Sequence, residues 1–201
     1  MDWKDITVKK YYQILEILED NQGDALETNT ELIDCIWGID SASIPIVKFS
    51  YYLKELEFLQ NPYKPKSPKR EYTIAGVKFK PTFDVSTITT AQYIDYQEFL
   101  KRKDVPHLLN VLFIKDGEEY GQSDYSELLY ENLMLTDYSD CQFFFLHLWK
   151  SLMMDTLNSS KRMLKKEYKK EKDPMKKEEL MNQMVALQTT LLELNDSEYL
   201  E

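Results

Sequence analysis

The amino-acid sequence predicts a mainly α-helical fold: a helical domain with one short β-hairpin and a C-terminal hairpin of long helices. Apolar residues recur every three or four positions through most of the 201 residues, which is the spacing of an amphipathic helix. The alternation of apolar and polar residues that is typical of strands is confined to residues 71–83. We therefore expect a helical body over residues 1–136. Over residues 137–201 we expect a long helix followed by an antiparallel or kinked, coiled-coil-like helix.

Three helices are expected in the first 60 residues. Thr7 has the side chain of an N-cap and precedes the first amphipathic stretch. Thr28 and Glu31 have the spacing of a capping box and predict the start of a second helix, which Gly38 would end. Pro45 predicts the first turn of a third helix. The apolar residues expected to pack are Val8, Tyr11, Tyr12, Leu15 and Leu18 in the first helix; Leu32, Ile33, Ile36 and Trp37 in the second; and Ile46, Phe49, Leu53, Leu56 and Leu59 in the third.

Residues 61–70 separate two helical patterns, because three prolines and four basic residues occur within these ten positions. This composition fits either a solvated, extended connector or a proline-rich docking peptide. Residues 71–83 then predict a β-hairpin that turns at Ala75-Gly76. Because an isolated hairpin is only marginally stable in water, we expect it to lie against helices.

Three further helices are expected before residue 137. Thr89, with a glutamine three residues later, has the spacing of a capping box. Asp104 precedes a first-turn proline and predicts the N-cap of a helix that includes Phe113. Asp124, with a glutamate three residues later, predicts the N-cap of a short helix.

The C-terminal third predicts two long helices. The first is expected from about Asp137 to Lys172, with the mostly apolar stretch from Cys141 to Met154 in the core. An aspartate before Pro174 predicts a break, with the proline at the first position of the last helix. Apolar residues of that helix are spaced alternately by four and three positions, as in a coiled coil, and can pack within the chain or between chains. This leucine seam consists of Leu180, Met184, Leu187, Leu191 and Leu194.

Charge is distributed unevenly along the chain. Residues 1–60 carry five basic and twelve acidic side chains, whereas residues 161–177 carry nine basic and three acidic side chains. Basic residues recur in pairs every four positions, so they share one broad helix face. This basic face consists of Lys161, Arg162, Lys165, Lys166, Lys169 and Lys170. Three interpretations are open: a solvated outer surface, a dock for an acidic partner or the acidic body of another copy, or a nucleic-acid contact.

Composition argues against several classes of function. The net charge of −10 argues against generic DNA coating, and no apolar run approaches the about 20 residues that span a bilayer. His107 and His147 lack partners at metal-ligand spacing, and the five glycines form no phosphate-binding loop. The N-terminal segment lacks the apolar stretch of a signal peptide, and Cys35 and Cys141 fit thiols in a reducing compartment. We therefore expect no metal, no cofactor, no membrane association and no catalytic residues.

Two adjoining motifs carry a resemblance to known proteins. The first has the pattern aromatic-x-Ile-x-Gly-x-x-Phe, at Tyr72, Ile74, Gly76 and Phe79. The second has the pattern Asp-x-Ser-x-Ile-Thr-x-x-Gln-aromatic-Ile-Asp, at Asp84, Ser86, Ile88, Thr89, Gln92, Tyr93, Ile94 and Asp95. A later Phe143-Phe144 pair opens a helical stretch. In these features the chain resembles small proteins of tailed bacteriophages, particularly crAss-like and related gut phages, that serve as virion connector or tail proteins or as tail-assembly factors.

The resemblance implies a non-catalytic structural or assembly protein of a tailed bacteriophage. It would act through contacts with other phage structural proteins in the portal–tail connector or tail, in the host cytoplasm during assembly or in the virion. The alternative is a phage nucleic-acid-associated or cargo protein that uses the basic helix over residues 161–177. The expected partner-binding residues are the leucine seam together with Lys165, Lys166, Lys169 and Lys170, and the seam also allows a homo-oligomer.

Overall fold

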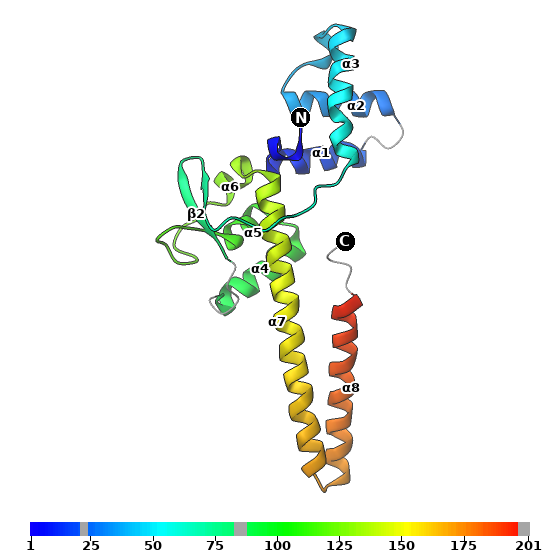
Figure 1. Cartoon of the computed structure of the whole chain (residues 1–201), viewed down its shortest axis with the longest axis vertical. Helices are drawn as coiled ribbons and strands as arrows, with labels where there is room; N and C mark the ends of the chain where they lie inside the picture. The colour runs from blue at the N-terminus through cyan, green and yellow to red at the C-terminus, as the bar shows by residue number, and fades with distance from the viewer. Residues whose placement is uncertain (21–23, 83–87, 197–201) are drawn as a thin grey trace. The chain divides into compact units, whose positions relative to one another are not determined.

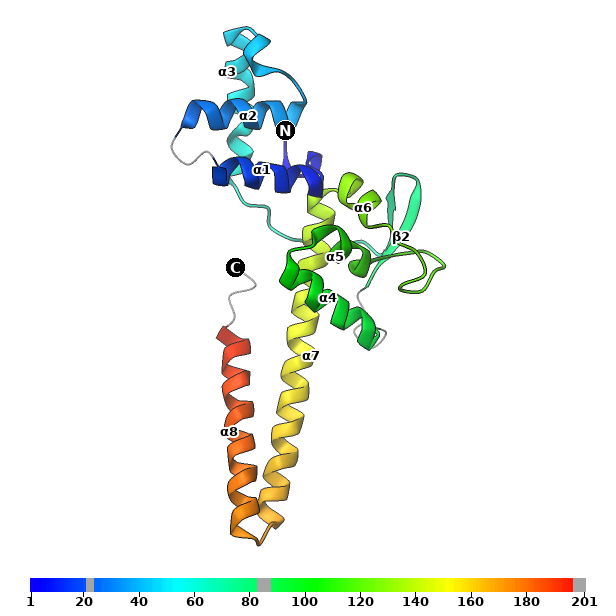
Figure 2. The same cartoon turned by 180° about the vertical axis from the view of Figure 1, so that it is seen from behind.

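A computed structural model of the protein describes residues 1–20, 24–82 and 88–196, without the side chains of Trp149 and residues 192–196. The chain divides into two compact units, residues 1–142 and residues 143–201. The predicted fold class is confirmed, since helices dominate, the strands form one small antiparallel sheet, and the last two helices form a hairpin (Figures 1 and 2). The predicted motif residues Asp84 and Ser86 lie outside the described residues, as does the end of the predicted hairpin at residue 83.

The N-terminal part of the first unit is a three-helix arrangement around its own hydrophobic cluster. Its elements are η1 (Trp3–Asp5), α1 (Val8–Asp20), α2 (Ala25–Trp37), η2 (Ser41–Ser43), α3 (Ile46–Glu55) and η3 (Leu56–Gln60). The buried residues of the cluster are Ile6, Ile14, Leu32, Ile33, Ile36 and Leu56. They come from all three helices or the segments that flank them, so the helices hold one another in place through a shared core.

The ends of these helices follow capping chemistry, with one correction to the prediction. Thr7 caps α1 as predicted, since its Oγ1 accepts a hydrogen bond from Lys10 N–H at 3.3 Å. The helix start predicted at Thr28 is wrong: α2 begins at Ala25, because Asp24 Oδ1 accepts hydrogen bonds from the next turn at 3.0 and 3.1 Å. Aspartate is as good an N-cap as threonine, and the earlier cap decides where the helix begins. Gly38 ends α2 in the left-handed region, with a φ of 65°, as predicted.

The strands form a sheet of order β1-β2-β3, in which both neighbouring pairs are antiparallel. The predicted hairpin is confirmed: β1 (Tyr72–Ile74) and β2 (Val77–Pro81) are joined by Ala75-Gly76, whose φ angles of 48° and 80° suit a tight hairpin turn. The third strand, β3 (Phe113–Lys115), was not predicted. Phe113 was expected in the preceding helix, but its backbone is extended and pairs with β2, so the second edge of the hairpin is covered.

Three short helices pack together, with α5 (Val105–Leu112) in contact with β3 and with both α4 (Thr90–Arg102) and α6 (Ser126–Asn132). The capping box at Thr89 is confirmed, since its Oγ1 accepts a hydrogen bond from the backbone N–H of Gln92 at 3.1 Å. Asp104 caps α5 as predicted, and accepts a hydrogen bond from the backbone of His107. α6 begins later than predicted, after Tyr125, although Asp124 still accepts a hydrogen bond from the first turn.

A short antiparallel bridge ties the N-terminal helices to the rest of the first unit. Thr7 pairs with Met134, between the end of α6 and the start of α7 (Leu135–Lys170). Val8 N–H donates to Leu133 O at 2.9 Å, and Leu135 N–H donates to Ile6 O at 2.8 Å. These backbone hydrogen bonds are buried among apolar side chains, so they fix the start of α1 against the α6–α7 junction.

The second unit is the hairpin of the C-terminal part of α7 with α8 (Pro174–Asp196). α8 begins as predicted, because Asp173 Oδ1 accepts a hydrogen bond from Met175 N–H at 2.9 Å. The prediction that the stretch from Cys141 to Met154 lies in the core holds only in part. Cys141 is buried, whereas Phe143 is 39% exposed and Leu152 is 42% exposed. A helix that is apolar around its whole circumference needs neighbours on every side to be buried.

Among the described residues, no helix combines the length and the apolar character that crossing a bilayer requires.

Candidate interaction surfaces

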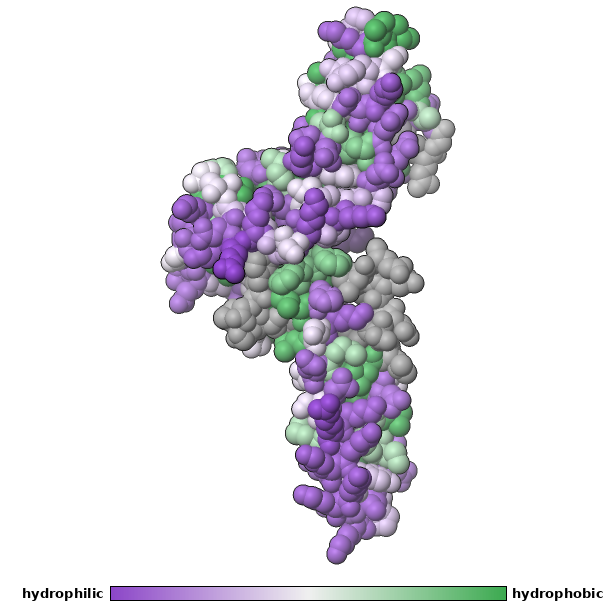
Figure 3. Space-filling model, viewed as in Figure 1, coloured by the Kyte–Doolittle hydropathy of each residue, from purple (hydrophilic) through white to green (hydrophobic). Residues whose placement is uncertain are grey.

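α3 presents an apolar face to solvent, which we call the α3 face: Ile46, Val47 and Tyr51. These side chains are 80%, 78% and 59% exposed. Ile46 was expected to pack, and that prediction is wrong: helical spacing identifies the packed face, but the first turn of α3 extends beyond the cluster that its later turns contact. Figure 3 shows hydrophobic surface at this end of the first unit. Exposed groups of large apolar side chains mark interaction sites more often than isolated ones do.

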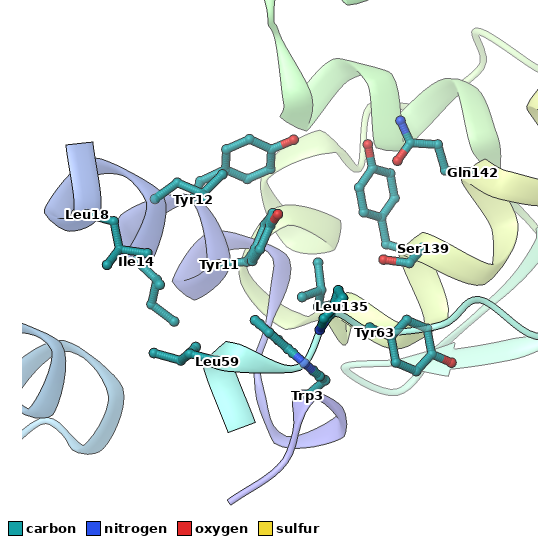
Figure 4. Close-up of a pocket in the computed structure, with 13 residues that line it drawn as sticks. Trp3, Tyr11, Tyr12, Ile14, Leu18, Leu59, Tyr63, Leu135, Ser139 and Gln142 are labelled. Carbon is teal, nitrogen blue, oxygen red and sulfur yellow. The ribbon is translucent and has the colours of Figure 1, made fainter. Parts of the chain in front are cut away.

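An aromatic pocket of about 460 Å³ lies in the first unit, between α1, the segment after η3 and the start of α7 (Figure 4). Its aromatic walls are Trp3, Tyr11, Tyr12, Tyr63 and Tyr138. Burial raises the pKa of Tyr138 well above its ordinary value, and also raises that of Tyr12, with which it shares a hydrogen bond. Both hydroxyls therefore stay protonated at neutral pH, so the pocket offers apolar surface with phenolic hydrogen-bonding groups.

The proline-rich connector, residues 61–70, is extended and held to the first turns of α7 by two carboxylates. Asp140 Oδ1 accepts hydrogen bonds from Tyr63 OH at 2.9 Å and from Lys66 N–H at 2.6 Å. Asp137 pairs with Lys69 Nζ at 2.8 Å. Burial and the bond to Asp140 raise the pKa of Tyr63 to about 12. Of the two interpretations of this segment, these contacts favour a connector, because part of it is bound within its own unit.

The leucine seam faces α7 within the second unit. Leu180, Met184, Leu187 and Leu191 are all half-buried, while the side chain of Leu194 lies outside the described residues. Two contacts join the helices along one edge of the seam: Lys161 Nζ donates to Gln188 Oε1 at 2.9 Å, and Lys177 Nζ lies 5.4 Å from the Tyr168 ring centroid. The two helices run side by side in both views (Figures 1 and 2). The seam thus packs within the chain, yet it leaves its residues partly in water.

The basic face lies on the part of α7 nearest the turn to α8. Arg162, Lys165, Lys166, Lys169 and Lys170 are exposed, and Lys161 is half-buried. In the described parts of the chain, none of these six cations lies within ion-pair distance of a carboxylate. Lys169 and Lys170 occupy the last turn of α7, where positive charge interacts favourably with the helix dipole. The predicted residues therefore form one accessible cationic surface.

The buried cysteine and the capping histidine are both held in structural contacts. The Cys141 thiol is buried and donates a hydrogen bond to Tyr72 OH at 3.3 Å. Burial raises the pKa of Cys141 to about 12, which leaves it as an unreactive thiol at neutral pH. The His107 ring stacks on Phe99 and contacts the Asp104 carboxylate, so it belongs to the cap of α5. Within residues 1–20, 24–82 and 88–196, no group of three or more ligating side chains is arranged to hold a metal ion.

Sequence reasoning identified the seam and the basic face but missed the α3 face and the aromatic pocket. The pocket joins residues from η1, α1, η3, the connector and α7, which only the folded chain brings together. The sequence carries one signal for the pocket, which is its wealth of aromatic residues. Trp3, Tyr11, Tyr12 and Tyr63 are more than the core of one short helix requires. Comparison of the chain with protein-family models, with curated proteins and with solved structures found no match.

Proposed function

We propose that this chain is a non-catalytic structural or assembly protein of a tailed bacteriophage, which acts by binding other phage proteins in the portal–tail connector or tail. The sequence resemblance over residues Tyr72 to Tyr96, with the later Phe143-Phe144 pair, supplies the phage context. The surfaces described above support the mode of action, because they offer apolar and charged area for protein contacts. Tyrosine, which is abundant here with 14 copies, is enriched at protein interfaces, since its ring covers a large area at a small entropic cost.

The observation that carries the proposal is the exposure of the α3 face. Ile46 and Val47 are branched aliphatic side chains, each more than three-quarters exposed, on a helix whose opposite side is packed. Removal of apolar surface from water is favourable by about 25 cal/mol per Å². A partner that covers this face would therefore gain binding energy from side chains that contribute little to the stability of the isolated chain.

Reconstitution with purified phage connector and tail proteins tests the proposal. We expect the mixture to sediment faster than its components at micromolar concentration, and the Val47→Asp variant to lose this shift. Aspartate in the first turn is favoured by the helix dipole, so the variant should fold normally. Gln97→Asp, at an exposed position of α4, is the matched control and should bind like the wild type. Absence of any shift with the wild type would refute the proposal.

Nucleic-acid association is the second candidate, and the exposed cations of the basic face support it. Binding through Lys and Arg would weaken steeply with salt, because phosphate contacts release counterions. The triple variant Lys165→Glu, Lys166→Glu and Lys169→Glu should then lose all retention on a DNA column at low salt. If the wild type itself passes through that column at low salt, this candidate is eliminated.

A further inference from the structure

The second unit has an apolar interior that its own two helices do not close. From Leu146 to Leu191, every side chain that the structure describes is at least partly exposed, including those of the leucine seam. Two helices cannot enclose a core by themselves, since each apolar stripe faces only one neighbour. Additional large apolar side chains on α8, Met181 at 44% and Val185 at 59% exposed, lie beside the seam.

The contacts between the two helices show which residues share one side of the hairpin. Lys161 and Tyr168 of α7 stand one heptad apart and contact Gln188 and Lys177 of α8, respectively. Met154 precedes Lys161 by one heptad, and Met181 precedes Gln188 by one heptad, so both lie on this same side. Val185 follows Met181 by one helical turn. We call this surface the open arm face: Met154, Lys161, Tyr168, Lys177, Met181, Val185 and Gln188.

We infer that the open arm face binds the same face of a second copy of this chain, so that two hairpins form an antiparallel four-helix bundle. A second hairpin supplies the apolar neighbours that the half-buried seam lacks, in the packing geometry common to helical bundles. The occupant is a second copy because the charge of the whole hairpin is complementary to that of a second hairpin placed beside it in the opposite direction.

Charge determines the direction in which the two hairpins pair. The half of the hairpin nearest its turn, residues 158–188, carries nine basic and five acidic side chains, a net charge of +4. At the other end, residues 143–157 are neutral and residues 189–196 carry a net charge of −2. Parallel pairing would bring the two positive ends together, whereas antiparallel pairing places each positive end against a neutral or negative one.

The first test measures self-association by sedimentation velocity across a range of concentrations. We expect the wild type to form a dimer at micromolar concentration, and Met181→Asp with Val185→Asp to weaken the dimer at least about tenfold. Asn182→Asp with Ala186→Asp is the matched control: it places two charges at the same spacing on exposed positions one residue along. The control should dimerise like the wild type. A wild type that stays monomeric throughout, or a control that is equally weakened, would overturn the inference.

The second test measures the direction of pairing with a spin label at the turn between α7 and α8. Met175→Cys introduces the label site in a Cys35→Ser background, while Cys141 remains unlabelled because it is buried. Antiparallel pairing predicts a distance between labels of about 35 Å, the length of the 23-residue α8 at 1.5 Å per residue. A distance within about 20 Å, two helix spacings, would show parallel pairing and contradict the inference. These tests require only the purified chain, so they are independent of the phage reconstitution.

Discussion

The two units of the chain differ in how completely they bury their apolar side chains. In its described residues, the first unit, residues 1–142, combines α1 to α6 and the first turns of α7 with a three-stranded sheet, and contains side chains such as Phe79 and Leu109 that are fully buried. The described part of the second unit consists of the rest of α7 and α8, and its described seam residues Leu180, Met184, Leu187 and Leu191 stay partly exposed. Helical spacing alone therefore does not make a core. Burial requires neighbours on several sides, which the packed helices and sheet of the first unit supply and a single hairpin does not.

The largest expected loss of stability comes from replacing a buried leucine, and we compare one leucine from each unit. Leu109→Ala removes a fully buried side chain from the first unit and should lower the free energy of unfolding by about 2–5 kcal/mol. Leu187→Ala removes a half-buried side chain of the seam and should cost less than half as much in the monomer, since less area leaves water. Urea denaturation of both variants at low protein concentration measures the difference. Equal losses would show that the second unit is packed as tightly as the first.

A smaller effect is expected at the connector. Asp140→Ala removes the acceptor for both Tyr63 and Lys66, and should destabilise the first unit by about 1–3 kcal/mol. Asp155→Ala changes an exposed carboxylate on the same helix, within the second unit, and serves as the control. Thermal unfolding of the two variants should differ by several degrees. A similar midpoint for both would mean that the connector is not held by Asp140.

Removal of a helix N-cap should lower the stability of its unit by about 1 kcal/mol. Thr89→Ala removes the capping box of α4 in the first unit, and Asp173→Ala removes the cap of α8 in the second. The first change should shift the cooperative unfolding of residues 1–142. The second should instead reduce helix content before that transition, because α8 has little core to hold it. Circular dichroism melts separate the two cases, and a single coincident transition in both variants would argue against independent units.

The smallest effect concerns alkaline pH. Tyr63 has its pKa raised to about 12 in the folded chain by burial and by its bond to Asp140, against about 10 in the unfolded chain. A raised pKa means that the stability contributed by Tyr63 is fully present below pH 10 and is lost as the pH rises through 12. The stability difference between the wild type and Tyr63→Phe should therefore shrink between pH 10 and 12. If the stability difference between the two proteins stays constant from pH 10 to 12, the raised pKa of Tyr63 is contradicted.

Local signals predicted much of the fold, because caps and turns are encoded by neighbouring residues. Thr7, Thr89, Asp104 and the Ala75-Gly76 turn act as their sequence patterns indicate. The errors arose where a distant partner decides the outcome. Phe113 is extended rather than helical because it pairs with β2. That pairing depends on the free hydrogen-bonding edge of a strand more than thirty residues earlier in the chain.

The interaction surfaces divide in the same way. The leucine seam and the basic face lie on single helices, so residue spacing was enough to define them. The aromatic pocket assembles five separate segments, and the α3 face depends on where along a helix the packing begins. Neither property is a periodicity of the sequence. Both appear only when the tertiary neighbours of each side chain are known.

The contrast between a complete core and an incomplete one is tested most directly by amide hydrogen exchange at several protein concentrations. Amides of α5 should be protected equally at every concentration, because the first unit is stabilised by its own core. Amides of α8 should exchange quickly in dilute solution and gain at least about tenfold protection as the concentration rises and hairpins pair. Protection of α8 that already equals that of α5 in dilute solution, and does not change with concentration, would contradict this account.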